Sequence, residues 1–228
     1  MVAAVTLPAH SSAVVVASAI LFDLDGVLVD SQRAVEQAWL RWADEQHLEA
    51  GEVLAVIHGR RGQDSVRLLT PHLDPVQQVE RVREYEAESE GDGLTAVPGA
   101  LECVSLARRG RWAVVTSGGR ELAAQRLAAA GLPVPAVLVT GDDVKEGKPD
   151  PEPYLRAATE LGVPPVHCLV VEDAPAGIQA AKRAAMTVLA VTTTHPAAEL
   201  TQADRVFAAM DEVASYLRNQ ARSDSPRV

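Results

Sequence analysis

The sequence has few cysteine, lysine and aromatic residues, and it has no long apolar run. Its 228 residues include two cysteines, Cys103 and Cys168, and aromatic residues make up 4% of the chain. So few cysteines exclude a disulfide-stabilised scaffold, and no apolar run approaches the roughly twenty residues that a membrane-spanning helix needs. The first basic residue is Arg33, so the charge pattern of a secretory signal is missing. We therefore expect a cytoplasmic protein with no membrane partner, in which both thiols are free and buried.

The charge balance is acidic. Asp and Glu number 31 against 21 Lys and Arg, which gives a formal net charge of -10 at pH 7. Proteins that bind nucleic acid or anionic lipid without sequence preference need a basic face, and this composition argues against one. We therefore expect no nucleic-acid partner, and an anionic small molecule would have to be held locally by a few basic groups and a metal ion.

Two carboxylates follow a short apolar run near the start of the chain. Residues 19–22 (AILF) are apolar throughout, and Asp23 and Asp25 come directly after them. A strand that is apolar on both faces is typical of a buried parallel sheet, and ligands bind at the carboxyl edge of such a sheet. A solvated turn is the alternative, because Asp and Gly are ordinary turn residues. The pair is a candidate site whose interpretation depends on the rest of the chain.

Further polar groups follow apolar runs later in the chain. Together they add a hydroxyl, a lysine and a second acid pair, which are the groups needed to hold a phosphate and a divalent metal ion. They are Thr116-Ser117-Gly118 after residues 114–115, Lys148 within residues 146–149 (EGKP), and Glu172-Asp173 after residues 169–171.

These motifs resemble those of the haloacid dehalogenase superfamily of phosphohydrolases, in the form that carries a helical cap inserted after the first motif. Residues 116–118, 143–154 and 171–178 are similar to the branch with glycerol-3-phosphatases and 2-deoxyglucose-6-phosphate phosphatases. Residues 34–59 also resemble the hexitol and sugar phosphatases of that branch. The resemblance covers nearly the whole chain and implies a Rossmann-like fold.

The periodicity divides the chain into two kinds of segment. Residues 31–96 have helical spacing only, whereas helices and strands alternate from residue 98 onward. The alternation predicts right-handed βαβ units and an α/β fold with a parallel sheet. We therefore expect a core of residues 1–30 and 97–228 and an inserted α-helical cap of residues 31–96. The charged residues 80–90 fit a solvated helix face better than an acidic docking surface. In the sheet, the resemblance places the strand before Asp23 between the strands that precede Thr116 and Asp173.

The resemblance assigns roles to the motif residues. It makes Asp23 the nucleophile that forms an aspartyl-phosphate, and Asp25 the acid that protonates the leaving alcohol and then the base that activates water. It implies Mg²⁺ bound by Asp23, the backbone carbonyl of Asp25 and Asp173, with Glu172 either a ligand through water or an orienting group for Asp173. Because Asp173 precedes Pro175, it also fits the N-cap of a following helix.

Basic and hydroxyl groups complete the expected phosphate site. Thr116 lies where a hydroxyl, followed by the backbone at Ser117 and Gly118, can donate to phosphoryl oxygens. The sequence has three lysines, and we assign Lys148 to Asp23 and the phosphate, whereas Lys145 and Lys182 fit solvated positions. The segment 58–61 supplies candidate contacts to substrate hydroxyls, with solvated side chains near a helix end as the alternative: His58, Arg60 and Arg61.

Other activities of the superfamily fit less well. Dehalogenases lack the second acid, so Asp25 argues against them, and phosphonoacetaldehyde hydrolases need a cap lysine, which this cap does not contain. A β-phosphoglucomutase remains the main alternative, but Val35 and Gly62 stand where it has histidine and arginine. A catalytically silent binding or regulatory protein is a second alternative. We predict a magnesium-dependent phosphomonoesterase for small phosphorylated sugars or polyols such as hexitol, hexose or glycerol phosphates.

Overall fold

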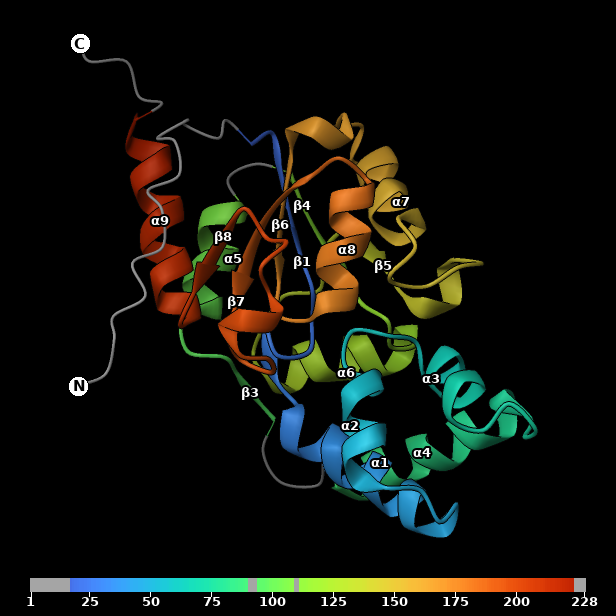
Figure 1. Cartoon of the computed structure of the whole chain (residues 1–228). Helices are drawn as coiled ribbons and strands as arrows, with labels where there is room; N and C mark the ends of the chain where they lie inside the picture. The colour runs from blue at the N-terminus through green and yellow to red at the C-terminus, as the bar shows by residue number, and fades with distance from the viewer. Residues whose placement is uncertain (1–16, 90–93, 109–110, 224–228) are drawn as a thin grey trace, which may run out of the picture.

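The computed structural model describes residues 17–89, 94–108 and 111–223, and its centre is a six-stranded parallel sheet (Figure 1). The strand order is β5-β4-β1-β6-β7-β8, so β1 lies between the strands that precede Thr116 and Asp173, as expected. The strands are β1 (Ala19–Phe22), β4 (Arg111–Val115), β5 (Val137–Val139), β6 (Cys168–Glu172), β7 (Thr187–Val191) and β8 (Arg205–Phe207).

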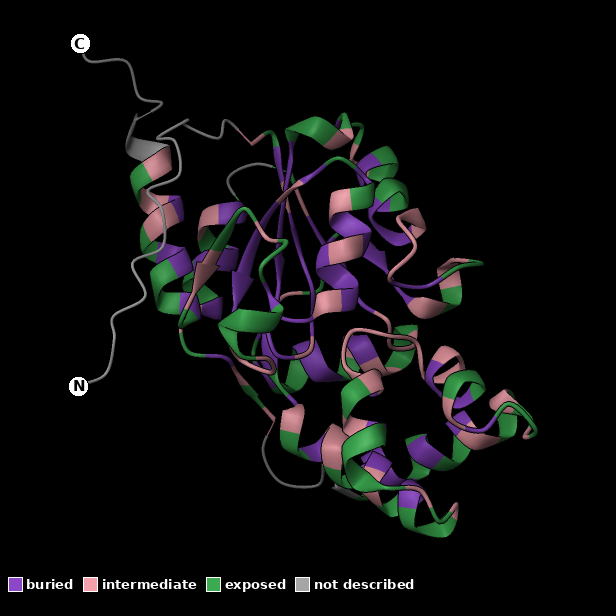
Figure 2. Cartoon of the chain, in the orientation of Figure 1, coloured by how far each residue is buried: buried purple, intermediate pink, exposed green. Residues whose placement is uncertain are grey.

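Helices cover both faces of the sheet because successive strand side chains point to opposite sides. In β1, Phe22 packs into one apolar layer with α5 (Ala100–Ala107), α6 (Arg120–Ala129) and α9 (Met210–Ser223). Leu21 packs into the other layer with α7 (Glu152–Leu161) and α8 (Pro175–Arg183). Figure 2 shows the buried strands between these helices. The α/β fold with a parallel sheet that the alternating pattern predicts is confirmed.

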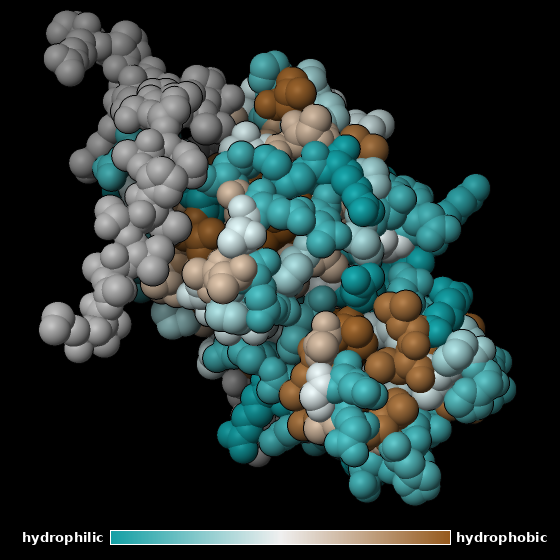
Figure 3. Space-filling view, in the orientation of Figure 1, coloured by the Kyte–Doolittle hydropathy of each residue, from teal (hydrophilic) through white to brown (hydrophobic). Residues whose placement is uncertain are grey.

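Four further helices form a separate packing unit beyond the carboxyl ends of the central strands (Figure 1). They surround their own apolar cluster, which contains Trp39 and Trp42. On the first of them, Ala34, Ala38 and Trp42 recur at four-residue spacing and are all buried. Figure 3 shows hydrophobic residues gathering on the surface of this unit as well. We call α1 (Gln32–Glu45), α2 (Ala50–Ile57), α3 (Gly62–Leu69) and α4 (Pro75–Ser89) the helical unit.

A short antiparallel ribbon joins the helical unit to the sheet. It consists of β2 (Val29–Asp30) and β3 (Thr95–Ala96), which the sequence did not predict because two residues are too few to show a period. The remaining elements of the described ranges are three short 3₁₀ helices in loops, at Gly141–Asp143, Pro165–His167 and Ala197–Glu199. Among the described residues, no helix is long and apolar enough to cross a membrane.

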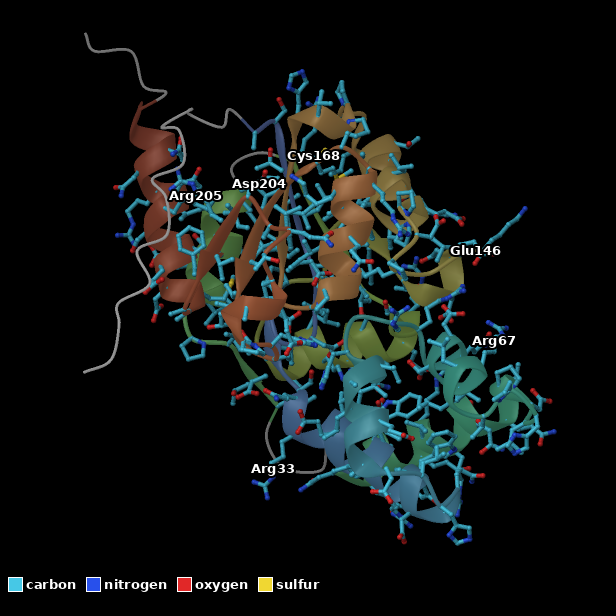
Figure 4. The ribbon with its side chains drawn as sticks, viewed as in Figure 1. Arg33, Arg67, Glu146, Cys168, Asp204 and Arg205 are labelled. Carbon is cyan, nitrogen blue, oxygen red and sulfur yellow. The ribbon has the colours of Figure 1, made fainter. Side chains whose placement is uncertain are left out.

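Both cysteines are free and buried, as predicted. Burial raises the pKa of Cys103 to about 12 and that of Cys168 to about 11. Cys168 lies at the end of the sheet away from the helical unit (Figure 4). Neither thiol has the character of a nucleophile, so both act as small core residues.

Candidate active site

Three buried carboxylates converge at the carboxyl edge of the sheet. Asp23 follows β1, Glu172 ends β6 and Asp173 comes next, so two adjacent parallel strands deliver all three. Ligand oxygens of the three lie within 4.8 Å of one another. Gly26, at φ +79°, permits this approach, because a Cβ there would lie 2.1 Å from Asp173 Oδ2.

Lys148 is the cation inside this cluster. Its side chain is fully buried, and Nζ donates to Asp23 Oδ1 at 2.5 Å, to Glu172 Oε1 at 2.7 Å and to the Val115 carbonyl at 3.1 Å. Burial favours the neutral amine, but the two carboxylates outweigh it and raise the pKa of Lys148 above its usual value. Lys148 therefore stays protonated and positively charged near neutral pH.

One lysine does not balance three carboxylates. Burial, followed by repulsion from Glu172 and Asp25, raises the pKa of Asp23 to about 7 although Lys148 opposes the shift. Burial and the charges of Glu172 and Asp23 also raise the pKa of Asp173. With all three acids ionised, the cluster and its lysine carry a formal charge of -2. An oxygen-rich, doubly negative cluster of this kind fits a divalent cation, with Asp23 and Asp173 as candidate ligands.

Both carboxylate oxygens of Glu172 accept hydrogen bonds from the protein. Its Oε1 accepts from Lys148 and from the Tyr154 hydroxyl at 2.8 Å, while Oε2 accepts the backbone N–H groups of Asp173 and Ala174 at 2.9 and 3.1 Å. A Cβ on Gly177 would lie 1.6 Å from Oε1, so the carboxylate also needs a glycine beside it. These contacts fit an orienting role better than direct metal binding.

Asp173 does not cap the next helix, contrary to one expectation. The helix α8 begins at Pro175 with Ala174 as the N-cap residue, and no side chain caps it there. Asp173 Oδ2 instead accepts the Thr194 hydroxyl at 2.6 Å. That bond fixes one oxygen of Asp173 beside the carboxylate of Asp23.

Asp25 is held apart from this cluster. Its Oδ1 accepts Ser31 Oγ at 2.6 Å and Arg126 Nη1 at 2.8 Å, and its Oδ2 lies 3.5 Å from Thr116 Oγ1. Arg126 also donates to Glu86 of α4 at 3.3 Å. Neither Ser31 nor Arg126 was predicted from the sequence, although Arg126 stands beside Leu127 on the apolar side of α6, where an arginine is unusual.

Thr116, Ser117 and Gly118 form the turn after β4. Thr116 is buried and accepts the Gly118 N–H at 3.1 Å, while Ser117 donates to the Gly59 carbonyl of the helical unit at 3.0 Å. A Cβ on Gly59 would lie 2.7 Å from Ala174 Cβ. The loop between α2 and α3 of the helical unit therefore contacts both the turn after Thr116 and the loop after Asp173.

A cavity of about 110 Å³ lies between the core and the helical unit. His58 and Arg60 line it, as do Val35 and Gly62. Burial and the neighbouring ring of His195 lower the pKa of His58. The core contributes motif residues to the lining: Asp23, Asp25, Thr116, Ser117, Gly118 and Asp173.

Arg61 lies elsewhere, although the sequence predicted that it contacts substrate. It is not among the cavity-lining residues, and its guanidinium binds the Asp64 carboxylate and the carbonyls of Val144 and Lys145. It therefore holds the helical unit to a loop of the core.

The helix predicted as a solvated charged face also contributes to the cavity. Arg83 and Glu86 of α4 both line it. Arg83 Nη2 would lie 3.1 Å from a Cβ on Gly119, so its guanidinium lies beside the turn that follows Thr116. The prediction of a solvated face was wrong for Glu86, which is buried, whereas Arg83 remains exposed at the edge of the cavity.

Comparison with known proteins places this geometry in a family. A model of haloacid dehalogenase-like hydrolases matches residues 17–185. The chain is 42% identical to hexitol phosphatase A of Escherichia coli K12 over 85% of this chain and 91% of that one. It is 34% identical to glycerol-1-phosphate phosphohydrolase 2 of Saccharomyces cerevisiae over 78% and 75%. The crystal structure of a hydrolase from Pseudomonas syringae superposes with a TM-score of 0.77 at 30% identity, covering 89% of this chain and 98% of the other. The chain belongs to the haloacid dehalogenase-like hydrolases and is a phosphatase of that family, with a site suited to a divalent metal ion.

Proposed function

We propose that this phosphatase hydrolyses small phosphorylated polyols or sugars, with Mg²⁺, through an aspartyl-phosphate on Asp23. One observation carries the proposal: Asp23 is paired with a buried lysine beside a second acid, while Asp25 is held apart on separate partners. Two carboxylates of one loop therefore have different surroundings. Different surroundings are what a nucleophile and a general acid require.

The proposed reaction has two halves. The Asp23 carboxylate attacks phosphorus as the bond to the substrate oxygen breaks, and Asp25 gives its proton to the departing alkoxide. Asp25, now a carboxylate, removes a proton from water, which attacks the aspartyl-phosphate to release phosphate and regenerate Asp23. Splitting the displacement replaces one difficult step with two easier ones.

Charge around the phosphoryl oxygens lowers both barriers. Lys148 is already aimed at Asp23, and Thr116 with the backbone at Ser117 and Gly118 borders the same cavity. In this proposal Asp23, the Asp25 carbonyl and Asp173 hold Mg²⁺, and Glu172 orients Asp173 and Lys148. When bound, the ion supplies positive charge to the phosphoryl group and keeps Asp23 ionised.

We also propose that residues 31–96 act as a cap on a core of residues 1–30 and 97–228. The β2-β3 ribbon is the connection between the two, and the helical unit contributes one wall of the cavity. Residues 1–16 of that core lie outside the described ranges. A cap that closes over the substrate would exclude water during the first half-reaction and admit it for the second.

The relatives and the cavity support the substrate class. Hexitol phosphatase A and glycerol-1-phosphate phosphohydrolase 2 are both phosphatases of small polyol phosphates by name, and a cavity of about 110 Å³ suits a small molecule. His58 and Arg60 are proposed contacts to substrate hydroxyls, and Arg83 joins them because it borders the same cavity. Arg61 is no longer proposed for this role.

A mutase reaction is less well supported. Val35 and Gly62, which stand where a β-phosphoglucomutase has basic residues, both line the cavity. A Cβ on Gly62 would lie 3.0 Å from Val79, so a long side chain there would need repacking. Nothing basic at these two positions can hold the second phosphate of a sugar bisphosphate.

The test is phosphate release by purified enzyme from glycerol phosphates, hexitol phosphates and hexose phosphates with and without Mg²⁺. We expect release that depends on Mg²⁺ and is lost in Asp23→Asn. A parallel incubation with β-glucose 1-phosphate and a trace of the 1,6-bisphosphate tests the alternative. Glucose 6-phosphate accumulating faster than free phosphate would contradict the proposal.

We further propose a cytoplasmic enzyme. The two free thiols fit a reducing compartment, and the net charge of -10 disfavours nucleic-acid and membrane partners.

A further inference from the structure

Arg126 is a buried arginine with partners in two distant parts of the chain. It is 3% exposed, and its Nη1 donates to Asp25 Oδ1 of the core while its Nη2 donates to Glu86 Oε2 of the helical unit. Removing a guanidinium from water costs several kcal/mol, about as much as the pairing returns, so a buried pair of this kind is weak evidence for a purely stabilising role. Its position at the catalytic acid points to a role in the reaction.

The bonds to Asp25 distinguish its two oxygens. Oδ1 accepts both Arg126 Nη1 at 2.8 Å and Ser31 Oγ at 2.6 Å, whereas the contact of Oδ2 with Thr116 Oγ1 is a long one of 3.5 Å. With two donors already on Oδ1, Oδ2 is the oxygen of Asp25 that is left to carry the proton which the proposed reaction requires.

Glu86 connects this arrangement to the helical unit. It lies on α4, is 7% exposed and accepts from Arg126 at 3.3 Å across the boundary between unit and core. A guanidinium can reach two carboxylates at once through its planar fork, whereas an ammonium is a single point charge.

We propose that Arg126 is a positioning residue that fixes Asp25 so that Oδ2 faces the leaving group, and that its bond to Glu86 ties this orientation to the docked helical unit. This role rests on the proposed functions of Asp23 and Asp25. Asp25 is then aligned only when the helical unit is docked on the core. When the unit is not docked, Asp25 is not oriented to give its proton to the leaving group.

A series of aryl phosphates tests the role of Arg126, because these substrates differ in leaving-group basicity and offer no sugar hydroxyls. The value of kcat/KM reports the steps up to release of the phenol. Phenyl phosphate needs more help from the acid than 4-nitrophenyl phosphate. Arg126→Gln should therefore lose about tenfold more kcat/KM with phenyl phosphate than with 4-nitrophenyl phosphate, a fraction of what a general acid contributes. Arg126→Lys should restore part of the difference, because it keeps one charged bond.

The second arm tests the tie to the helical unit. Glu86→Gln keeps the shape of the side chain and leaves the Arg126–Asp25 bond, so it should steepen the leaving-group dependence in the same direction but less. Arg156→Gln is the matched control, because Arg156 is a half-exposed arginine of α7 paired with Glu160, and it should leave the dependence unchanged. Thermal unfolding identifies variants that fail to fold. If Arg126→Gln fails, Arg126→Lys and Glu86→Gln decide the question.

The other possible results of these assays each contradict one part of the proposal for Arg126. Equal losses with every aryl phosphate would make Arg126 merely structural, and a loss confined to polyol phosphates would make it a contact to substrate hydroxyls. An unchanged dependence in Glu86→Gln would remove the tie to the helical unit. Inactivity of the wild type, or full activity of Asp23→Asn, would instead remove the proposed function.

Discussion

Lys148→Ala removes the one ammonium inside the acid cluster. Nζ lies 2.5 Å from Asp23 and 2.7 Å from Glu172, and its side chain has no exposed surface. Removing one preorganised charge contact from an active site commonly costs about 3 to 4 kcal/mol, so turnover should fall by about two to three orders of magnitude. Glu172 would keep its bond from Tyr154 but lose its charge partner.

The same substitution should lower stability in a pH-dependent way. Breaking a buried ion pair by removing one partner costs about 3 to 5 kcal/mol when the other partner stays charged. The pKa of Asp23 is already about 7, so below that pH this carboxyl can take up a proton and reduce the cost. We expect the loss in the free energy of unfolding to be larger at pH 8 than at pH 6.

The assays are steady-state phosphate release in saturating Mg²⁺ and urea unfolding at both pH values. Lys145→Ala is the matched control, because Lys145 is exposed on the same loop. It should change neither quantity appreciably. A Lys148→Ala enzyme within tenfold of wild-type turnover, or a larger effect at Lys145, would refute the assignment of Lys148 to the phosphoryl site.

The acids and the thiols carry four further predictions. Asp23→Asn should abolish phosphate release unless it reverts by deamidation, and Asp25→Asn should accumulate a slowly hydrolysed phospho-enzyme from an activated aryl phosphate, detectable by intact mass. In a metal chelator, the raised pKa values of Asp23 and Asp173 mean that the folded state binds more protons than the unfolded state above pH 3.8. The contribution of Asp23 to the free energy of unfolding is therefore fully present at low pH and is lost as pH rises through about 7, and that of Asp173 is lost in the same direction. Added Mg²⁺ should raise the melting temperature more at pH 8 than at pH 5, and an Asp23→Asn/Asp173→Asn variant should lose that difference. Cys103 and Cys168 should react with a disulfide reagent only on unfolding, and rapid labelling of the native protein would contradict their burial.

The sequence predicted the positions of the acids and of Thr116 because a buried parallel strand has a simple signature. An apolar run that ends in polar residues places them at one edge of a sheet, which is why Asp23, Thr116 and Asp173 could be expected to meet. Their order across the sheet came from family resemblance, since hydrophobic periodicity carries no information on which strands are neighbours. The division of labour between Glu172 and Asp173 became visible only with the partners of each oxygen.

The contacts between the helical unit and the core could not be predicted in the same way. Arg126 and Glu86 are 40 positions apart. Glu86 looks like a surface residue of a charged helix, and the place of Arg126 on the apolar side of its helix does not reveal which residue it pairs with. The same holds for Arg60 and Arg61, which are adjacent and chemically identical. Only the loop geometry directs one to the cavity and the other to the Val144 carbonyl.

The charge of the site sets an order for binding. A phosphate dianion must enter a chain of net charge -10, at a cluster that carries a formal -2 with its lysine counted. Arg126 is already engaged by two carboxylates, so it offers the substrate little net positive charge. A divalent cation would neutralise the cluster before the substrate arrives, which makes metal first and substrate second the favourable sequence.

Initial rates at varied Mg²⁺ and varied glycerol phosphate test this order. The substrate KM should fall as Mg²⁺ rises and then level off, and Asp173→Ala should shift that fall to higher Mg²⁺ without abolishing it. Raising ionic strength should weaken binding of substrate to the metal-saturated enzyme only modestly, because the attraction acts over a few ångströms inside a cavity. A substrate KM independent of Mg²⁺, with only kcat responding, would show that the phosphate enters without the cation. Lys148 would then be the cation that offsets the negative charge of Asp23 when the substrate binds.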